Sequence, residues 1–114
     1  MSACLFCRIA AHEVPAQIIA EMPDVLAFKD VNPQAPTHVL IIPKRHLGGM
    51  PDLTDEHAGL LAQVMRLANQ LAQAAGIATS GFRLVVNSGP DAGQSVAHVH
   101  WHLLGGRRMA WPPG

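Results

Sequence analysis

The spacing of apolar residues predicts one long amphipathic helix in the middle of the chain. Leucine, valine and alanine recur three and four positions apart between residues 60 and 75, as on one face of a helix. These residues are Leu60, Leu61, Val64, Leu67, Ala68, Leu71 and Ala75. Thr54 is a suitable N-terminal cap, and two acidic residues follow it in the first turn, where the helix dipole favours negative charge. Gly76 is a suitable C-terminal cap, so the helix is expected to end there.

Shorter apolar segments predict strands on both sides of this helix. Five segments have the composition of strands: 17–21, 25–30, 38–43, 82–87 and 97–104. Residues 39–42 and 84–86 are entirely apolar, which predicts two central strands that are buried on both faces. A short helix is expected at residues 5–11. Because the strands do not alternate with helices as βαβ units do, the predicted fold class is α+β: an antiparallel sheet of about five strands, one long helix and a short N-terminal helix.

Composition then excludes several classes of protein. The chain has 114 residues, 49% of them hydrophobic and 14% charged, which predicts one globular domain over residues 1–114 with an irregular tail at about 107–114. Eight basic and eight acidic residues leave no net charge, so neither nucleic acid nor an anionic membrane is an expected partner. The longest purely aliphatic run, at residues 39–42, is far too short to cross a bilayer. The N-terminus does not resemble a secretory signal, and two cysteines cannot form a disulfide framework, so a cytoplasmic location is expected.

Histidine is the unusual residue of this sequence. Three of the seven histidines alternate with apolar residues in the last predicted strand. Because side chains alternate between the two faces of a strand, His98, His100 and His102 are expected to share one face. A polar face open to water would explain them without any function, but threonine, serine or lysine would serve that purpose equally well. The pattern therefore favours chemistry at this face, whereas His12 and His57 lie outside any motif and are expected at the surface.

Two kinds of chemistry fit a row of imidazoles. Two histidines that are two residues apart on a strand can bind one catalytic zinc ion. Alternatively, the central imidazole is neutral at pH 7 and attacks phosphorus as a nucleophile, while its neighbours orient it and move protons. Zinc hydrolases usually have a carboxylate close to their ligands, and residues 94–106 contain none. The sequence therefore favours the nucleophile.

Residues 98–104, His-Val-His-Trp-His-Leu-Leu, resemble the His-φ-His-φ-His-φ-φ signature of the histidine-triad nucleotide-binding proteins, where φ is an apolar residue. Further resemblance to this family extends along the chain, at residues 28–30, 33–38, 42–46, 86–89, 93–95 and 111–114. Gly105, Gly106 and the Trp-Pro-Pro-Gly ending are similar to the small purine nucleoside phosphoramidases of the family rather than to its dinucleoside polyphosphate hydrolases. The resemblance implies a HIT-like fold in which the sheet continues across a homodimer.

The resemblance also implies a reaction. In this family the middle histidine, here His100, attacks the α-phosphorus of a purine nucleotide such as an AMP derivative. A nucleotidyl-histidine intermediate forms, water then releases the nucleoside monophosphate, and catalysis requires no cofactor. The expected activity is hydrolysis of the P–N bond of purine nucleoside 5′-phosphoramidates. Two alternatives remain open: a dinucleoside polyphosphate hydrolase or nucleotidyl transferase, and a nonenzymatic nucleotide-binding regulatory module.

The functional positions of the family map onto this chain residue by residue. The expected catalytic residues are His38, Ser95, His100 and His102. The expected nucleotide contacts are Leu5, Phe6, Ile9, Phe28, Asp30, Val31, Asn87, Gly93, Gln94, Ser95, His100, His102 and Trp111. Among these, Asp30 is expected to accept hydrogen bonds from the ribose hydroxyls, and residues 93–95 are expected to cradle the phosphate. Trp111 resembles a residue that reaches the active site of the partner in family dimers.

A separate metal site is expected near the N-terminus. Cys4 and Cys7 form a Cys-x-x-Cys pair, and a closed tetrahedral zinc site needs two further ligands. Similar bacterial proteins supply these ligands from the positions that correspond here to His46 and His98, which implies a structural zinc ion. A redox pair and two free buried thiols are the alternatives for the cysteines.

Overall fold

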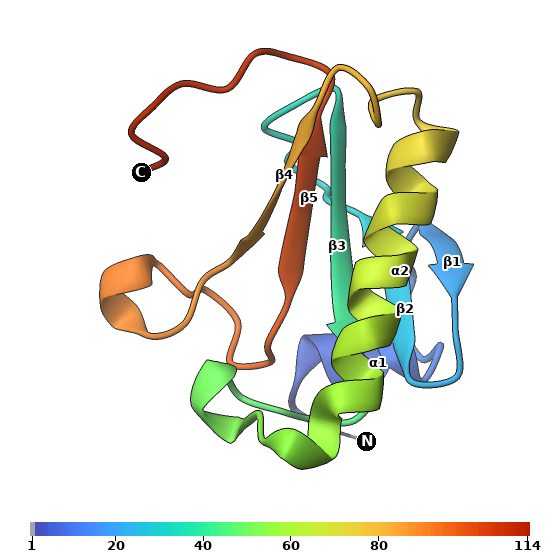
Figure 1. The fold of residues 1–114 in the computed structure, drawn as a ribbon. Helices are drawn as coiled ribbons and strands as arrows, with labels where there is room; N and C mark the ends of the chain where they lie inside the picture. The colour runs from blue at the N-terminus through green and yellow to red at the C-terminus, as the bar shows by residue number, and fades with distance from the viewer. Residues whose placement is uncertain (1) are drawn as a thin grey trace.

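The computed structural model describes residues 2–114 and contains one antiparallel sheet with two helices packed against it (Figure 1). The strands lie in the order β1-β2-β3-β5-β4. Their bounds are β1 Ile18–Glu21, β2 Val25–Lys29, β3 Thr37–Pro43, β4 Phe82–Val86 and β5 Trp101–Gly105. Helix α1 spans Leu5–Ala10 and helix α2 spans Ala58–Ala74, with single 3-10 turns at Met50–Asp52 (η1), Asp55–His57 (η2) and Pro90–Ala92 (η3). The predicted α+β fold class is confirmed. Within the described chain, neither helix is both long and apolar enough to span a lipid bilayer.

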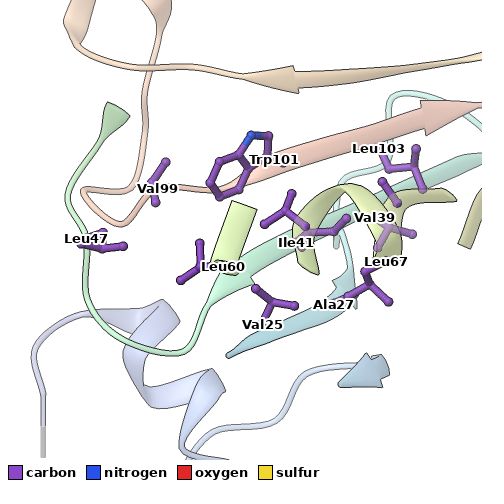
Figure 2. Packing of buried hydrophobic residues seen from close by; sticks show 12 residues of the cluster. Val25, Ala27, Val39, Ile41, Leu47, Leu60, Leu67, Val99, Trp101 and Leu103 are labelled. Carbon is purple, nitrogen blue, oxygen red and sulfur yellow. The ribbon is translucent and has the colours of Figure 1, made fainter. Parts of the chain in front are cut away.

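The two faces of the sheet carry different layers. Helix α2 covers one face, where Leu60 and Leu67 pack against alternate residues of β2, β3 and β5 (Figure 2). These sheet residues are Val25, Ala27, Val39, Ile41, Trp101 and Leu103. Val64 belongs to the same cluster. Helix α1 packs on the opposite face through Phe6 and Ile9, and the residues beneath it are Leu26, Phe28, Leu40 and Ile42. Because α1 has only six residues, part of this second face remains available for a ligand cavity.

The turn before α2 explains where this helix begins. Thr54 caps η2, since its hydroxyl accepts a hydrogen bond from the Glu56 N–H at 3.3 Å. His57 reaches back, and its Nδ1 accepts a hydrogen bond from the Thr54 N–H at 2.9 Å. His57 is consequently buried, with only 6% of the residue exposed, so its predicted surface position is wrong, whereas His12 is exposed as expected. At the other end of α2, Gly76 has a φ of +73°, in the left-handed region that a glycine cap adopts readily.

Two predictions about the strands need correction. Residues 84–86 lie in β4, which is a half-buried edge strand and not a central one. The centre of the sheet is formed by β3 and β5, because β5 returns between β3 and β4 and pairs with both. The last strand also begins at Trp101 and not at residue 97, because the Val99 N–H donates to the Leu47 carbonyl at 2.6 Å and not to a neighbouring strand. The predicted burial of residues 39–42 in β3 is confirmed.

Candidate active site and metal site

A cavity of about 420 Å³ opens on the face of the sheet that α1 covers in part. Its apolar lining comes from α1, β2, β3 and nearby loops and consists mainly of Leu5, Phe6, Ile9, Phe28, Val31, Leu40 and Val96. Its polar lining includes Asp30, Ser95, His100 and His102. Apolar walls combined with a few hydrogen-bonding groups are typical of a site for a small organic ligand. The fold therefore brings nine of the thirteen expected nucleotide contacts to one cavity, from three segments of the chain at residues 5–9, 28–31 and 95–102.

His100 is almost fully buried in this lining, with 3% of the residue exposed. Its Nδ1 lies 2.8 Å from the backbone oxygen of His98. A carbonyl oxygen can only accept a hydrogen bond, so Nδ1 carries the hydrogen and Nε2 of the neutral ring keeps its lone pair. The ring of Phe6 packs edge-on against the imidazole, with 5.2 Å between the ring centroids. The backbone thus leaves Nε2 of His100 as the nitrogen that is able to attack an electrophile.

His102 and His38 form a hydrogen-bonded pair beside His100. The Gln34 N–H donates to His38 Nδ1 at 3.0 Å, so the hydrogen of the neutral His38 ring is on Nε2. His38 Nε2 lies 2.9 Å from His102 Nδ1 and donates to it, which leaves the hydrogen of His102 on its Nε2. Burial, together with the charges of the neighbouring His100 and His38 rings, lowers the pKa of His102 from 6.5 to about 4. Burial also lowers the pKa of His38, so both rings are neutral at pH 7 and His102 offers an N–H donor.

Asp30 lies next to this pair of histidines. Its Oδ1 accepts a hydrogen bond from the Asn32 N–H at 2.8 Å, and its Oδ2 lies 3.4 Å from His38 Nε2. Asp30, His38 and His102 are close enough to surround a cation, with ligand atoms within 4.8 Å of one another. However, His38 Nε2 carries the hydrogen that it donates to His102, so this nitrogen has no free lone pair for a metal. The cluster is therefore better suited to hydrogen bonding than to metal binding.

The side chain of Gln94 holds the loop that precedes the histidines. Its Nε2 donates to the carbonyls of Gly48, at 2.7 Å, and Val96, at 3.0 Å. Its Oε1 accepts a hydrogen bond from the Gly89 N–H at 2.9 Å. Gln94 therefore ties the loop at residues 88–95 to the loop at residues 46–50, and it does not line the cavity. Ser95, the next residue, does line it.

Three more residues that were expected to contact a nucleotide lie outside the cavity lining: Asn87, Gly93 and Trp111. Asn87 and Gly93 flank the η3 turn, in the segment that leads to Ser95. Trp111 belongs to the C-terminal tail, and 82% of the residue is exposed. The Arg83 guanidinium donates to the Ala110 carbonyl and so fastens this tail beside β4. In this single chain, Trp111 does not reach the cavity.

The four residues expected to bind metal meet at one point. Cys4 Sγ lies 3.4 Å from His98 Nδ1, and Cys7 Sγ lies 3.4 Å from His46 Nδ1 and 3.5 Å from His98 Nδ1. A tetrahedral zinc ion with Zn–S of about 2.3 Å and Zn–N of about 2.0 Å places sulfur and nitrogen roughly 3.5 Å apart. His98 Nε2 donates to the Pro43 carbonyl at 2.8 Å, which directs the lone pair on Nδ1 towards the thiols. The residues present therefore fit a zinc ion.

Backbone groups are the part of the site that sequence reasoning missed. The His98 carbonyl, the Gln34 N–H and the Pro43 carbonyl each bond to one ring nitrogen of a histidine. Every residue carries such groups, so no motif identifies the ones that are used. The sequence signal that could have helped is proline at position 43, since the strand ends there and its carbonyl is free to bond elsewhere.

Comparison with known proteins shows what this chain resembles. The profile of the HIT domain family matches residues 11–109. A HIT family hydrolase from Legionella pneumophila superposes with a TM-score of 0.95 and 52% sequence identity, covering 97% of this chain and 99% of that one. The 14 kDa zinc-binding protein of Zea mays is 46% identical over 96% of this chain and 87% of its own. Adenylylsulfatase HINT1 of Arabidopsis thaliana is 43% identical over 96% of this chain and 76% of its own.

Proposed function

Because this chain belongs to the HIT domain family, we propose that it hydrolyses the P–N bond of purine nucleoside 5′-phosphoramidates and releases the nucleoside monophosphate. The observation that carries this proposal is the contact between His100 Nδ1 and the His98 carbonyl at 2.8 Å. In the neutral tautomer this contact leaves the lone pair on Nε2, in a cavity that also holds donors for a phosphate and an apolar wall for a base.

The nucleotide binds with its base against the α1 side of the cavity. Phe6 and Phe28 pack edge-to-face, with 5.5 Å between their centroids, and offer a rigid apolar wall to a purine. The carboxylate of Asp30 accepts hydrogen bonds from the ribose hydroxyls. The Ser95 hydroxyl and the Nε2–H of His102 donate to the oxygens of the α-phosphate, because both residues line the same cavity as His100.

The reaction proceeds in two displacements at phosphorus. In the first, the Nε2 lone pair of His100 forms a bond to the α-phosphorus while the P–N bond of the substrate breaks. The amine leaves with that electron pair and takes up a proton from solvent, relayed by the Ser95 hydroxyl. In the second, water attacks the phosphorus and the bond to His100 breaks, which gives the nucleoside monophosphate and a proton and restores the neutral imidazole. The neutral His102 stabilises the negative charge that grows on the phosphoryl oxygens in both steps.

A zinc ion in this protein would be held by Cys4, Cys7, His46 and His98. Two thiolates and two imidazoles form a closed set of four ligands, so the ion would supply a structural cross-link and no catalytic position. It would join the start of α1 to the loop after β3 and to the segment before β5. The zinc-binding relative from Zea mays supports this assignment.

Adenylyl sulfate is a second candidate substrate, because one relative of this chain is named an adenylylsulfatase. Adenylylsulfatase HINT1 of Arabidopsis thaliana is 43% identical to this chain. With adenylyl sulfate, His100 would attack the same phosphorus and expel sulfate in place of an amine. Both substrates share the AMP group, so the cavity described above accommodates either one.

We also propose that the protein is a cytoplasmic homodimer that joins its sheets through β4. Strand β4 is an edge of the sheet, so one row of its backbone hydrogen-bonding groups has no partner strand within the described chain. Its side chains are only half-buried. Pairing with a second β4 would cover this edge and extend the sheet across two chains.

The proposed activity is tested with adenosine 5′-monophosphoramidate as substrate and AMP as the measured product. The wild-type protein should release AMP, and His100→Ala should lose at least about a thousandfold in kcat because the nucleophile is gone. His12→Ala removes an exposed histidine outside the cavity and should retain the wild-type rate. Rapid quenching should trap AMP covalently on the wild-type chain and not on His100→Ala.

Other results of this experiment would contradict the mechanism or favour a different function. Equal rates for His100→Ala and wild type would overturn the mechanism. Nucleotide binding without AMP release or covalent labelling would favour the nonenzymatic binding module. Faster cleavage of adenylyl sulfate or of diadenosine tetraphosphate would assign the natural leaving group to one of those classes.

A further inference from the structure

Helix α1 contributes residues to two sites at once. Its N-terminal cap, Cys4, and its third residue, Cys7, belong to the metal site. Leu5, Phe6 and Ile9, from the same two turns, line the nucleotide cavity. Within residues 4–9, the two cysteines of the metal site are therefore interspersed with three residues that line the cavity.

This helix depends on its surroundings for its structure. It has six residues, which is too short for a stable isolated helix. Its first turn is capped by the Cys4 thiol, which accepts a hydrogen bond from the Cys7 N–H at 3.4 Å. The cap and the metal ligand are thus the same sulfur atom, so metal binding fixes the point at which the helix begins.

Phe6 connects the two sites directly. Its ring, 5% exposed, packs edge-on against the metal ligand His98 at 5.9 Å between centroids and against Phe28 of the cavity wall at 5.5 Å. A metal ion that draws Cys4 and Cys7 towards His98 also sets the position of this ring relative to the cavity. A purine that packs against Phe6 in turn holds the helix in the position that metal binding requires.

We propose that metal binding and purine nucleotide binding are positively linked through α1, so that each ligand tightens the binding of the other. Whichever ligand binds first orders this short helix, and the second ligand then binds an ordered site. This inference rests on the proposed function in one respect: it requires that the cavity takes a purine nucleotide. Linkage is reciprocal, so the two affinities must change by the same factor.

The linkage predicts which part of the nucleotide matters. The base contacts α1, whereas the ribose and phosphate groups contact Asp30, Ser95, His100 and His102, none of which belongs to this helix. AMP should therefore strengthen metal binding, and ribose 5-phosphate, which has the same sugar and phosphate but no base, should not.

The test measures the Kd of Zn²⁺ by competition with a chromophoric chelator, without ligand, with saturating AMP and with saturating ribose 5-phosphate. We expect AMP to lower the Kd of Zn²⁺ by about tenfold and ribose 5-phosphate to leave it within about twofold. The Kd of AMP, measured by calorimetry on the zinc-loaded and chelator-treated protein, should change by the same factor of about ten. Circular dichroism of the chelator-treated protein verifies that its sheet and α2 persist.

Two variants test the route while they keep all four residues of the metal site. Phe6→Leu shortens the connecting side chain and should reduce the effect of AMP on the Kd of Zn²⁺ to about twofold or less. Val31→Ala alters a cavity residue outside α1, so it should weaken AMP binding and keep the tenfold linkage. Each titration starts from the zinc-loaded variant, and circular dichroism at its end point verifies that the sheet and α2 of the metal-free variant persist.

The outcomes separate this inference from the proposed function. If AMP binds but leaves the Kd of Zn²⁺ unchanged, the linkage is overturned and the proposed function stands. Equal tightening by AMP and ribose 5-phosphate would also overturn the route through α1. If AMP does not bind the zinc-loaded protein at all, the proposed function itself fails.

Discussion

In His38, His98 and His100, one ring nitrogen forms a hydrogen bond with a backbone group. This bond determines whether the other ring nitrogen of the neutral imidazole carries the hydrogen or the lone pair. His100 donates from Nδ1 to a carbonyl and His38 accepts at Nδ1 from an amide, so the two rings have opposite tautomers. His98 donates from Nε2 and turns Nδ1 towards the cysteines. Histidines that alternate along one short segment therefore have different chemical roles, which their sequence spacing does not distinguish.

The depressed pKa of His102 predicts how the protein responds to acid. Its pKa is lowered from 6.5 to about 4, so the folded protein binds this proton less readily than the unfolded chain does. This group therefore destabilises the fold progressively as the pH falls from 6.5 towards 4, and it has no such effect above that range. NMR of the His102 ring should show a titration midpoint near 4. Urea unfolding across the same pH range measures the accompanying loss of stability.

His102→Gln is the matched control for this titration, because glutamine keeps a hydrogen-bonding side chain without the titrating ring. The free energy of unfolding of this variant should decline less between pH 6.5 and pH 4 than that of the wild type. Identical pH profiles in the two proteins, or an NMR midpoint near 6.5, would contradict the prediction.

Gln94 provides a second prediction at the residue scale. Gln94→Glu replaces an amide that donates to the Gly48 and Val96 carbonyls by a carboxylate, which can only accept hydrogen bonds. Two carbonyls then lose their donor and face a negative charge, so the fold should lose about 1–3 kcal/mol of stability. The adjacent Ser95 should shift, and the kcat of phosphoramidate hydrolysis should fall about tenfold. Urea denaturation and steady-state kinetics provide the two measurements.

Gln70→Glu makes the same chemical change on the exposed surface of α2. It should change the free energy of unfolding by less than about 0.5 kcal/mol and leave the kcat unchanged. If Gln94→Glu behaves like this control, Gln94 does not position the loop.

At the scale of elements, the sequence pattern predicts a feature well when that feature depends on one helix or strand alone. The face of α2 follows from a spacing of three and four residues, and four of its five buried residues belong to the predicted set: Leu60, Val64, Leu67 and Ala68. The fifth, Ala72, was not predicted, and the predicted Ala75 is exposed because the helix ends at Ala74. The order of the strands depends on pairing between distant segments. For this reason the apolar residues 84–86 suggested a central strand, whereas the sheet places them in the edge strand β4. No local pattern records that β5 separates β4 from β3.

His57 shows that an isolated histidine can determine where an element begins. His57→Ala removes the Nδ1 acceptor of the Thr54 N–H and leaves a space where a buried ring was. The loss should amount to about 2 kcal/mol of unfolding free energy, from the missing cap and the cavity together. Urea denaturation at pH 7 measures it.

The exposed histidine serves as the comparison for His57. His12→Ala removes only a surface contact with Glu21 and should change the stability by less than about 0.5 kcal/mol. Comparable losses in the two variants would show that the cap does not stabilise the start of α2.

At the scale of the whole molecule, the cavity exists because segments from both ends of the chain meet on one face of the sheet. Residues of α1, the end of β2 and the segment before β5 contribute to it. Resemblance to the histidine-triad family identified most of these residues, because the family's motifs have the same residue types at the corresponding positions. It could not show that the Gln94 side chain bonds internally or that Trp111 lies outside the cavity, because both facts depend on contacts across the fold.

The exposed position of Trp111 and the edge position of β4 lead to the same expectation, a dimer. The wild-type protein should have twice the chain mass of 12.2 kDa in solution, measured by light scattering during gel filtration. Val85→Lys places a charge in the middle of β4, where it would oppose a second strand, and should yield a monomer. Ile19→Lys makes the same change in β1, the opposite edge of the sheet, and should leave the dimer intact. A dimer that survives Val85→Lys and is lost in Ile19→Lys would assign the interface to β1, and a wild-type monomer would mean that Trp111 contributes to no active site.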